Sequence, residues 1–113
     1  VTVNNSLDPF KFHVYGKNLI MFDHGELRAA DYPLIMATEV PVLFSETKYR
    51  EVHVGHLHKE MLNEYRGIKV RYLPSIAPSS QWEKTSGYLH QRCAQGLVWS
   101  KDGGLVAINQ VNR

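Results

Sequence analysis

The sequence has little cysteine, no long apolar run and little net charge, and each shortage excludes a class of protein. Its one cysteine, Cys93, has no thiol partner within the chain, so this is not a small secreted domain stapled by disulfides. No stretch of about 18 apolar residues and no charged-then-apolar leader is present. We therefore expect no membrane contact and a soluble cytoplasmic protein. A net charge of +2 is too weak to argue for a nucleic-acid partner.

What is present fits one globular domain. The chain has 113 residues, of which 43% are hydrophobic and 21% charged, which is ordinary for a globular protein. Residues 1–10 form a polar lead-in, and residues 11–113 are expected to be a single domain. The chain opens with Val1, which fits a fragment, a processed chain or a chain whose start is missing.

The first third of the domain predicts a hairpin followed by helices. Short apolar runs at residues 11–15 and 18–22, separated by Gly-Lys, predict two paired strands. From Asp31, a residue type suited to an N-cap, the pattern becomes helical, with Pro33 in the first turn. Because proline cannot lie inside a helix, Pro41 predicts a break and a second short helix over residues 41–47.

The rest of the domain is rich in predicted strands. Residues 50–54 and 68–73 predict two more strands, and residues 96–99 and 105–111 predict a terminal hairpin around the Lys-Asp-Gly-Gly turn at 101–104. The order predicts an α/β or α+β fold with a mixed sheet, two short helices and a C-terminal β-hairpin. So few helices would leave sheet faces uncovered, which predicts that a further layer is missing.

Three histidines follow predicted strands and are candidate metal ligands. His56 and His58 are two residues apart, so their side chains project to the same side, and His24 follows an earlier strand. Imidazole suits Zn, Mn, Fe or Ni, and such a pair can reach one ion or two adjacent ones. The alternative is chance, because a chain with six histidines often contains a His-x-His triplet.

Residues 55–58, Gly-His-Leu-His, look like the G-H-x-H motif that ends the ligand set of the calcineurin-like metallophosphoesterases. Residues 23–26, Asp-His-Gly-Glu, resemble the isolated strand-end histidine that precedes this motif in that family. The stretches 15–20 and 47–51 also look like phage and prophage members described as DNA-repair exonuclease-like. The resemblance covers most of the chain, from Phe12 to the terminal hairpin.

The resemblance implies a fold, a metal centre and a reaction. The chain would be the strand-rich C-terminal half of an αββα sandwich that holds two divalent ions, Mn²⁺ or Zn²⁺ with iron as a further candidate. His24 and His56 would bind the second ion, and His58 the first. The ions would polarise a phosphoryl oxygen and activate water, so the implied reaction is hydrolysis of a phosphodiester, DNA among the candidates.

The departures from the family pattern imply that this polypeptide is incomplete alone. The family also carries a D-x-H, a G-D with the bridging carboxylate and a G-N-H with the catalytic histidine, and none of these occurs here. Three imidazoles divided between two ions, with no bridging carboxylate, should hold metal weakly. We therefore expect the isolated chain to be inactive, with no catalytic residue of its own, and to need the N-terminal half of the enzyme as its partner.

Two other functions compete with this interpretation. A non-catalytic interaction domain derived from such an enzyme would keep the histidines and use its uncovered sheet to bind a partner or form a homo-oligomer. A small cupin-like metal barrel is the other, because H-x-H also occurs there. The cupin pattern requires a glutamate four or five residues after the second histidine. This chain has Leu62 and Asn63 at those positions, and Glu64 is one position too far.

The remaining polar candidates have simpler interpretations. His13 and His53 lie within predicted strands, which favours structural roles. Trp82 could stack on a base, although packing is the simpler role. Four basic residues on predicted strands or next to them could form a phosphate-facing patch or a solvated sheet face. They are Lys48, Arg50, Lys69 and Arg71.

Overall fold

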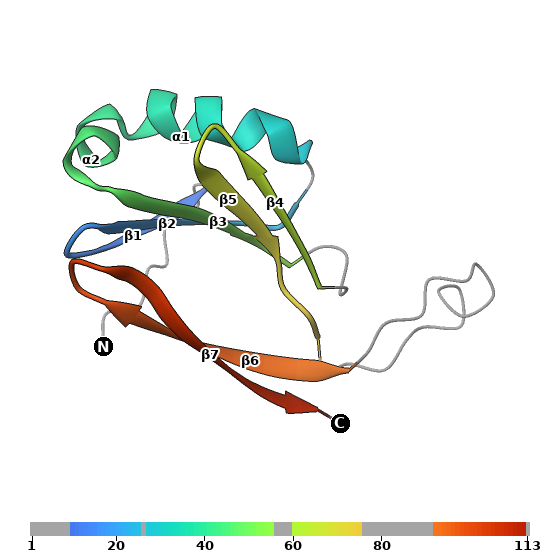
Figure 1. The fold of residues 1–113 in the computed structure, drawn as a ribbon. Coiled ribbons are helices and arrows are strands. Elements are labelled where there is room, and N and C mark those ends of the chain that lie inside the picture. The colour runs from blue at the N-terminus through green and yellow to red at the C-terminus, as the bar shows by residue number, and fades with distance from the viewer. Residues whose placement is uncertain (1–9, 26, 56–59, 76–91, 113) are drawn as a thin grey trace.

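The computed structural model describes residues 10–25, 27–55, 60–75 and 92–112 of the chain. These residues form a five-stranded sheet, a separate two-stranded sheet and two short helices, so the predicted strand-rich α/β fold is confirmed (Figure 1). The larger sheet contains β1 (Lys11–Tyr15), β2 (Asn18–Asp23), β3 (Tyr49–Val54), β4 (Met61–Tyr65) and β5 (Ile68–Tyr72). The smaller sheet contains β6 (Cys93–Ser100) and β7 (Gly104–Asn112).

The larger sheet has a parallel centre and antiparallel edges. Its strand order is β1-β2-β3-β5-β4, with β2, β3 and β5 parallel to one another and β1 and β4 antiparallel to their neighbours. The predicted hairpin of β1 and β2 is confirmed, and β5 begins at the predicted residue. Strand β4 was missed, because its sequence Met-Leu-Asn-Glu-Tyr carries polar residues on both faces of an edge strand.

The helices lie where the proline signals predicted them. After a single 3₁₀ turn at Ala29–Asp31, α1 spans Tyr32–Glu39 and α2 spans Pro41–Glu46, each with a proline in its first turn. The predicted N-cap residue, Asp31, is in the expected position, but its side chain does not cap the helix. Asp31 precedes α1, but its carboxylate makes no capping bond and instead accepts a hydrogen bond from Arg28 Nε at 3.2 Å.

One face of the larger sheet packs against the helices and forms the apolar core. Alternate residues of the parallel strands, including Val52 and Val54 of β3, are fully buried there against Tyr32 and Met36 of α1. Both helices cover this same face (Figure 1). The strands are therefore apolar toward the helices, and their other side chains must find cover on the opposite face.

The two-stranded sheet, here called the β6–β7 ribbon, lies against that opposite face. Its turn is seated on the turn between β1 and β2, where the Lys17 N–H donates to the Lys101 carbonyl at 2.8 Å. The buried Asn18 side chain donates from Nδ2 to the Ser100 carbonyl at 2.7 Å. Both strands of the ribbon extend beyond the predicted hairpin, and Cys93 at its start is buried.

Because the two turns are in close contact, adding one methyl group at Gly16 should lower the free energy of unfolding markedly. Gly16 and Gly67 have positive φ angles of 59° and 78°, but only at Gly16 would an added Cβ collide with the Lys101 carbonyl. A positive φ costs a non-glycine residue about 1–3 kcal/mol. We therefore expect both Gly→Ala changes to lower the free energy of unfolding, and Gly16→Ala to lower it by about 2 kcal/mol more because the ribbon must shift. Urea denaturation measures both, and equal losses would contradict this docking.

Candidate functional site

The predicted ligand segments begin at one edge of the larger sheet. Strands β2 and β3 are parallel neighbours whose register pairs Asp23 with Val54, so both strands end together. His24 follows β2 and Gly55 follows β3, so these residues leave the sheet at the same edge. The carboxyl ends of parallel strands are where α/β folds commonly bind ligands.

Of the three predicted ligands, the structure describes only His24. This residue is exposed, and Gly25 after it adopts a positive φ of 113°. His56 and His58 lie outside the described residues, as do Trp82 and the sixth histidine, His90. Within the described ranges, no three His, Cys, Asp or Glu side chains gather closely enough to hold a metal ion. The ligand assignment and the two-metal centre therefore stay predictions.

A carboxylate and a buried tyrosine meet at this same edge, which the sequence did not indicate. The Tyr32 hydroxyl donates a 2.5 Å hydrogen bond to Asp23 Oδ2, at the last residue of β2. Burial of Tyr32, together with this hydrogen bond and the charge of Asp23, raises the pKa of the tyrosine hydroxyl well above its ordinary value. The hydroxyl therefore keeps its proton and holds the carboxylate immediately before His24.

A second polar cluster lies under the β6–β7 ribbon. Arg71 Nε donates to Glu51 Oε1 at 2.9 Å, and His53 Nε2 lies 3.2 Å from the same oxygen. All three residues are nearly inaccessible, at 4% exposure for Glu51, 5% for His53 and 6% for Arg71. The His53 ring also packs against Phe22, with ring centroids 5.6 Å apart, and lies 6.1 Å from Trp99 of the ribbon. These contacts agree with the structural role predicted for His53.

Three of the four basic residues that could have formed one patch, Lys48, Arg50 and Lys69, line one pocket, and the fourth does not. Arg71 is buried in the cluster just described, whereas Lys48 and Lys69 are exposed. Arg50 points to the helix side, where its guanidinium donates to the carbonyls of Phe44 and Thr47 at 2.5 and 2.6 Å. The interpretation of these four residues as a phosphate-facing patch or a solvated face was therefore wrong for Arg71, which is buried. Its burial could not be predicted from the sequence, because strand alternation does not show which face the ribbon will cover.

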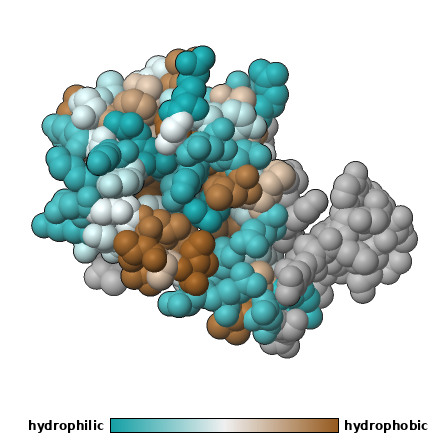
Figure 2. Space-filling model, viewed as in Figure 1, coloured by the Kyte–Doolittle hydropathy of each residue, from teal (hydrophilic) through white to brown (hydrophobic). Residues whose placement is uncertain are grey.

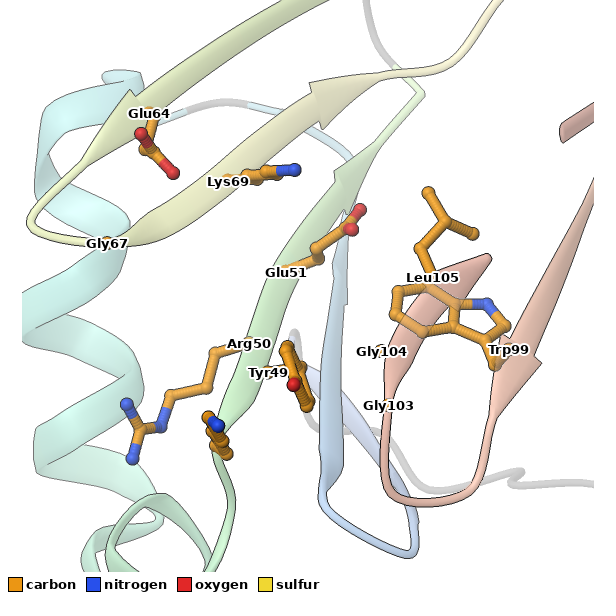
Figure 3. A pocket seen from close by; sticks show the side chains of 11 residues that line it. Tyr49, Arg50, Glu51, Glu64, Gly67, Lys69, Trp99, Gly103, Gly104 and Leu105 are labelled. Atoms are coloured by element: carbon orange, nitrogen blue, oxygen red, sulfur yellow. The ribbon is translucent and has the colours of Figure 1, made fainter. Parts of the chain in front are cut away.

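A pocket lies at the opposite edge of the larger sheet, where β3 and β5 begin. It encloses about 270 Å³ between the sheet and the turn of the ribbon. Trp99 and Leu105 of the ribbon face Glu51 and Lys69 of the sheet across it (Figure 3). Its further lining residues, from both layers, are Lys48, Tyr49, Arg50, Glu64, Gly67, Gly103 and Gly104. The pocket is thus separate from the edge that carries His24.

Comparison of the chain with protein-family models, with curated proteins and with solved structures gives no match. The likeness to metallophosphoesterases therefore rests on the motifs at residues 23–26 and 55–58 and on their order along the chain. Within the part of the chain that the structure describes, no helix is long and apolar enough to cross a membrane.

The buried cluster predicts an acid-sensitive contribution to stability. Burial acts to raise the pKa of Glu51, but hydrogen bonds from His53 and Arg71 and the charge of Arg71 outweigh it, so the pKa lies below the ordinary 4.5. A lowered pKa adds stability above pH 4.5 that is lost as the pH falls through the folded-state value. Removing the charge with Glu51→Gln leaves Arg71 buried without its counter-charge, which should cost about 3–5 kcal/mol at pH 7.

Urea denaturation between neutral and acid pH tests this expectation. The difference in unfolding free energy between the unmodified protein and Glu51→Gln should be constant above pH 4.5 and shrink below it. Glu64→Gln, at an exposed position on β4, is the matched control and should change stability little. A difference that stays constant into acid would show that Glu51 does not titrate as the buried pair requires.

Proposed function

We propose that this chain is the C-terminal part of a dimetal phosphoesterase that hydrolyses phosphodiesters, supplying histidine ligands to a centre it cannot complete alone. The observation that carries the proposal is the shared end of β2 and β3. These strands are parallel neighbours, and each is followed in the sequence by one of the two predicted ligand segments. Segments that leave adjacent parallel strands at one edge can bring their side chains together.

The donor chemistry of these residues fits a divalent transition-metal centre. Neutral imidazoles of His24, His56 and His58 suit Zn²⁺ or Mn²⁺, with iron a further candidate. When bound, a pair of such ions supplies Lewis acidity and an activated water for attack on phosphorus. The chain's own contribution is to hold imidazoles at the sheet edge, next to an Asp23 carboxylate fixed by Tyr32.

Two observations support incompleteness. The family's D-x-H, G-D and G-N-H motifs are absent from the sequence, and with them the bridging carboxylate and catalytic histidine. The ribbon is also a sheet of only two strands, whereas the sheet it covers has five. A complementary polypeptide that carries the missing motifs would supply both the ligands and the further layer. DNA is one candidate substrate of the assembled enzyme.

A non-catalytic interaction or oligomerisation domain is the alternative, and the ribbon is the observation that favours it. Strands β6 and β7 contain no charged residue, yet most of β7 is exposed. A surface of this kind suits pairing with another polypeptide without requiring any turnover. Metal affinity and complementation separate the two functions.

Metal affinity tests the ligand assignment directly. We expect the purified chain to bind Mn²⁺ or Zn²⁺ weakly in calorimetric titration, because three imidazoles without a carboxylate form a sparse ligand set. His24→Ala, His56→Ala and His58→Ala should each lower the affinity about tenfold or more, since even outer-shell changes cost about 10–100-fold. His13→Ala is the control, because this exposed histidine lies within β1. Equal affinity in all four variants would remove the ligand assignment.

Complementation tests the enzyme hypothesis itself. A polypeptide with the D-x-H, G-D and G-N-H motifs, encoded next to this chain, should restore hydrolysis of bis-p-nitrophenyl phosphate in the presence of Mn²⁺. Neither polypeptide should be active alone, and His56→Ala should abolish the restored activity because a metal ligand is lost. Tight association of the two polypeptides without turnover would instead favour the interaction domain.

A further inference from the structure

Strand β7 has one edge without a strand partner among the described residues. It pairs with β6 on one side, and the smaller sheet contains no other strand. The strand is nine residues long and contains neither a charge nor a proline. Natural proteins protect such edges with charges, prolines, bulges or cover, because unpaired N–H and C=O groups recruit other strands. The ribbon has one bulge, at Val106 of β7, because Val98 pairs with Ala107 and Trp99 with Leu105; residues 107–112 beyond it pair with β6 in regular register.

The surface of β7 is apolar as well as open. Residues 106–112 are all exposed, and apolar side chains gather over the ribbon (Figure 2). Val106 is 61% and Val111 71% exposed, with Ile108 between them at 42%. An isolated two-stranded sheet is at best marginally stable in water, and this ribbon is supported on the one face that packs against the larger sheet. The ribbon therefore has both a backbone edge and an apolar surface that a further strand would cover.

Contacts with the larger sheet leave the outer edge of β7 open. At the turn of the ribbon, the end of β6 bonds to Asn18 of β2, whereas Gly104 at the start of β7 lies against the Tyr49 ring of β3. The pocket borders the first residues of β7. At the other end of the ribbon it is β6 that lies against the larger sheet, since Gln95 Nε2 donates to Glu60 before β4 and the Cys93 N–H donates to the Ser75 carbonyl after β5. The outer edge of β7 is therefore left open along the ribbon among the described residues.

We propose that β7 is a homodimerisation edge, at which a second copy of this chain pairs antiparallel to form a continuous four-stranded sheet in the order β6-β7-β7-β6. A second copy fits because the edge is compatible with itself. Most homo-oligomers are twofold dimers, and a twofold axis places each residue of one β7 against the β7 of the other copy. With no charge on the strand, no like charges meet, and apolar residues face an apolar strand. The pairing also turns two two-stranded ribbons into one wider sheet.

Sedimentation velocity tests the dimer and its location. The unmodified protein should sediment as a dimer at about 100 μM, where an interface with a micromolar Kd is largely occupied. Val106→Lys/Val111→Lys places four like charges along the paired edges and should raise the dimer Kd about tenfold or more. The matched control is Leu34→Lys/Val42→Lys, which replaces two apolar residues on the helices of similar exposure, 74% and 64%. Circular dichroism establishes that both variants fold.

Each outcome decides the proposal. Dissociation of the β7 variant alone, with the control still dimeric, supports pairing at this edge. A protein that is monomeric at about 100 μM overturns the proposal, and the edge is then left for a different polypeptide. A dimer that survives both pairs of substitutions, or that is lost equally in both, also overturns it, because the contact then lies elsewhere or reflects charge alone. Raising the salt concentration should leave the dimer intact, since uncharged strands are not held by screened interactions.

Discussion

Three parallel strands in the middle of a sheet must be shielded from water on both faces, and the rest of this structure follows from that constraint. On one face the solution is apolar, because helices α1 and α2 carry the chain from β2 to β3 and bury valines and methionines. On the other face the described residues contain no helix, and the β6–β7 ribbon takes that place. Polar side chains under the ribbon are therefore buried, and they remain there because Glu51, Arg71 and His53 satisfy one another.

The same constraint places the predicted metal-binding segments and the pocket at opposite edges of the larger sheet. Parallel strands have all their carboxyl ends at one edge, which is where His24 and its neighbour Asp23 lie. Their amino ends, at the opposite edge, hold the pocket beneath the turn of the ribbon. A metal centre at the first edge and strand pairing along the ribbon are thus compatible within one small domain. The two proposals can fail independently, since they use different residues.

Local signals were sufficient to predict most of the elements. Glycine at the first turn, the prolines of the helices and the Asp-Gly-Gly turn of the ribbon act through their own backbone geometry, so the sequence shows them directly. Strand β4 was not predicted because an edge strand needs little alternation of apolar and polar residues. The burial of Arg71 was not predicted because it depends on a ribbon that lies more than twenty residues later in the chain. The histidine motifs predict a metal centre where β2 and β3 end, which stays a prediction, whereas the bond between Tyr32 and Asp23 depends on how α1 packs and carries no local signal.

The position of Cys93 gives the ribbon a built-in reporter. This residue is the chain's single thiol, it is buried, and its N–H donates to the Ser75 carbonyl where the ribbon begins. Alkylating reagents can reach a buried thiol only when its surroundings open, so their rate measures local opening and not the global unfolding reaction. Slow modification of an otherwise native protein would therefore time the separation of the two layers, without any label being introduced.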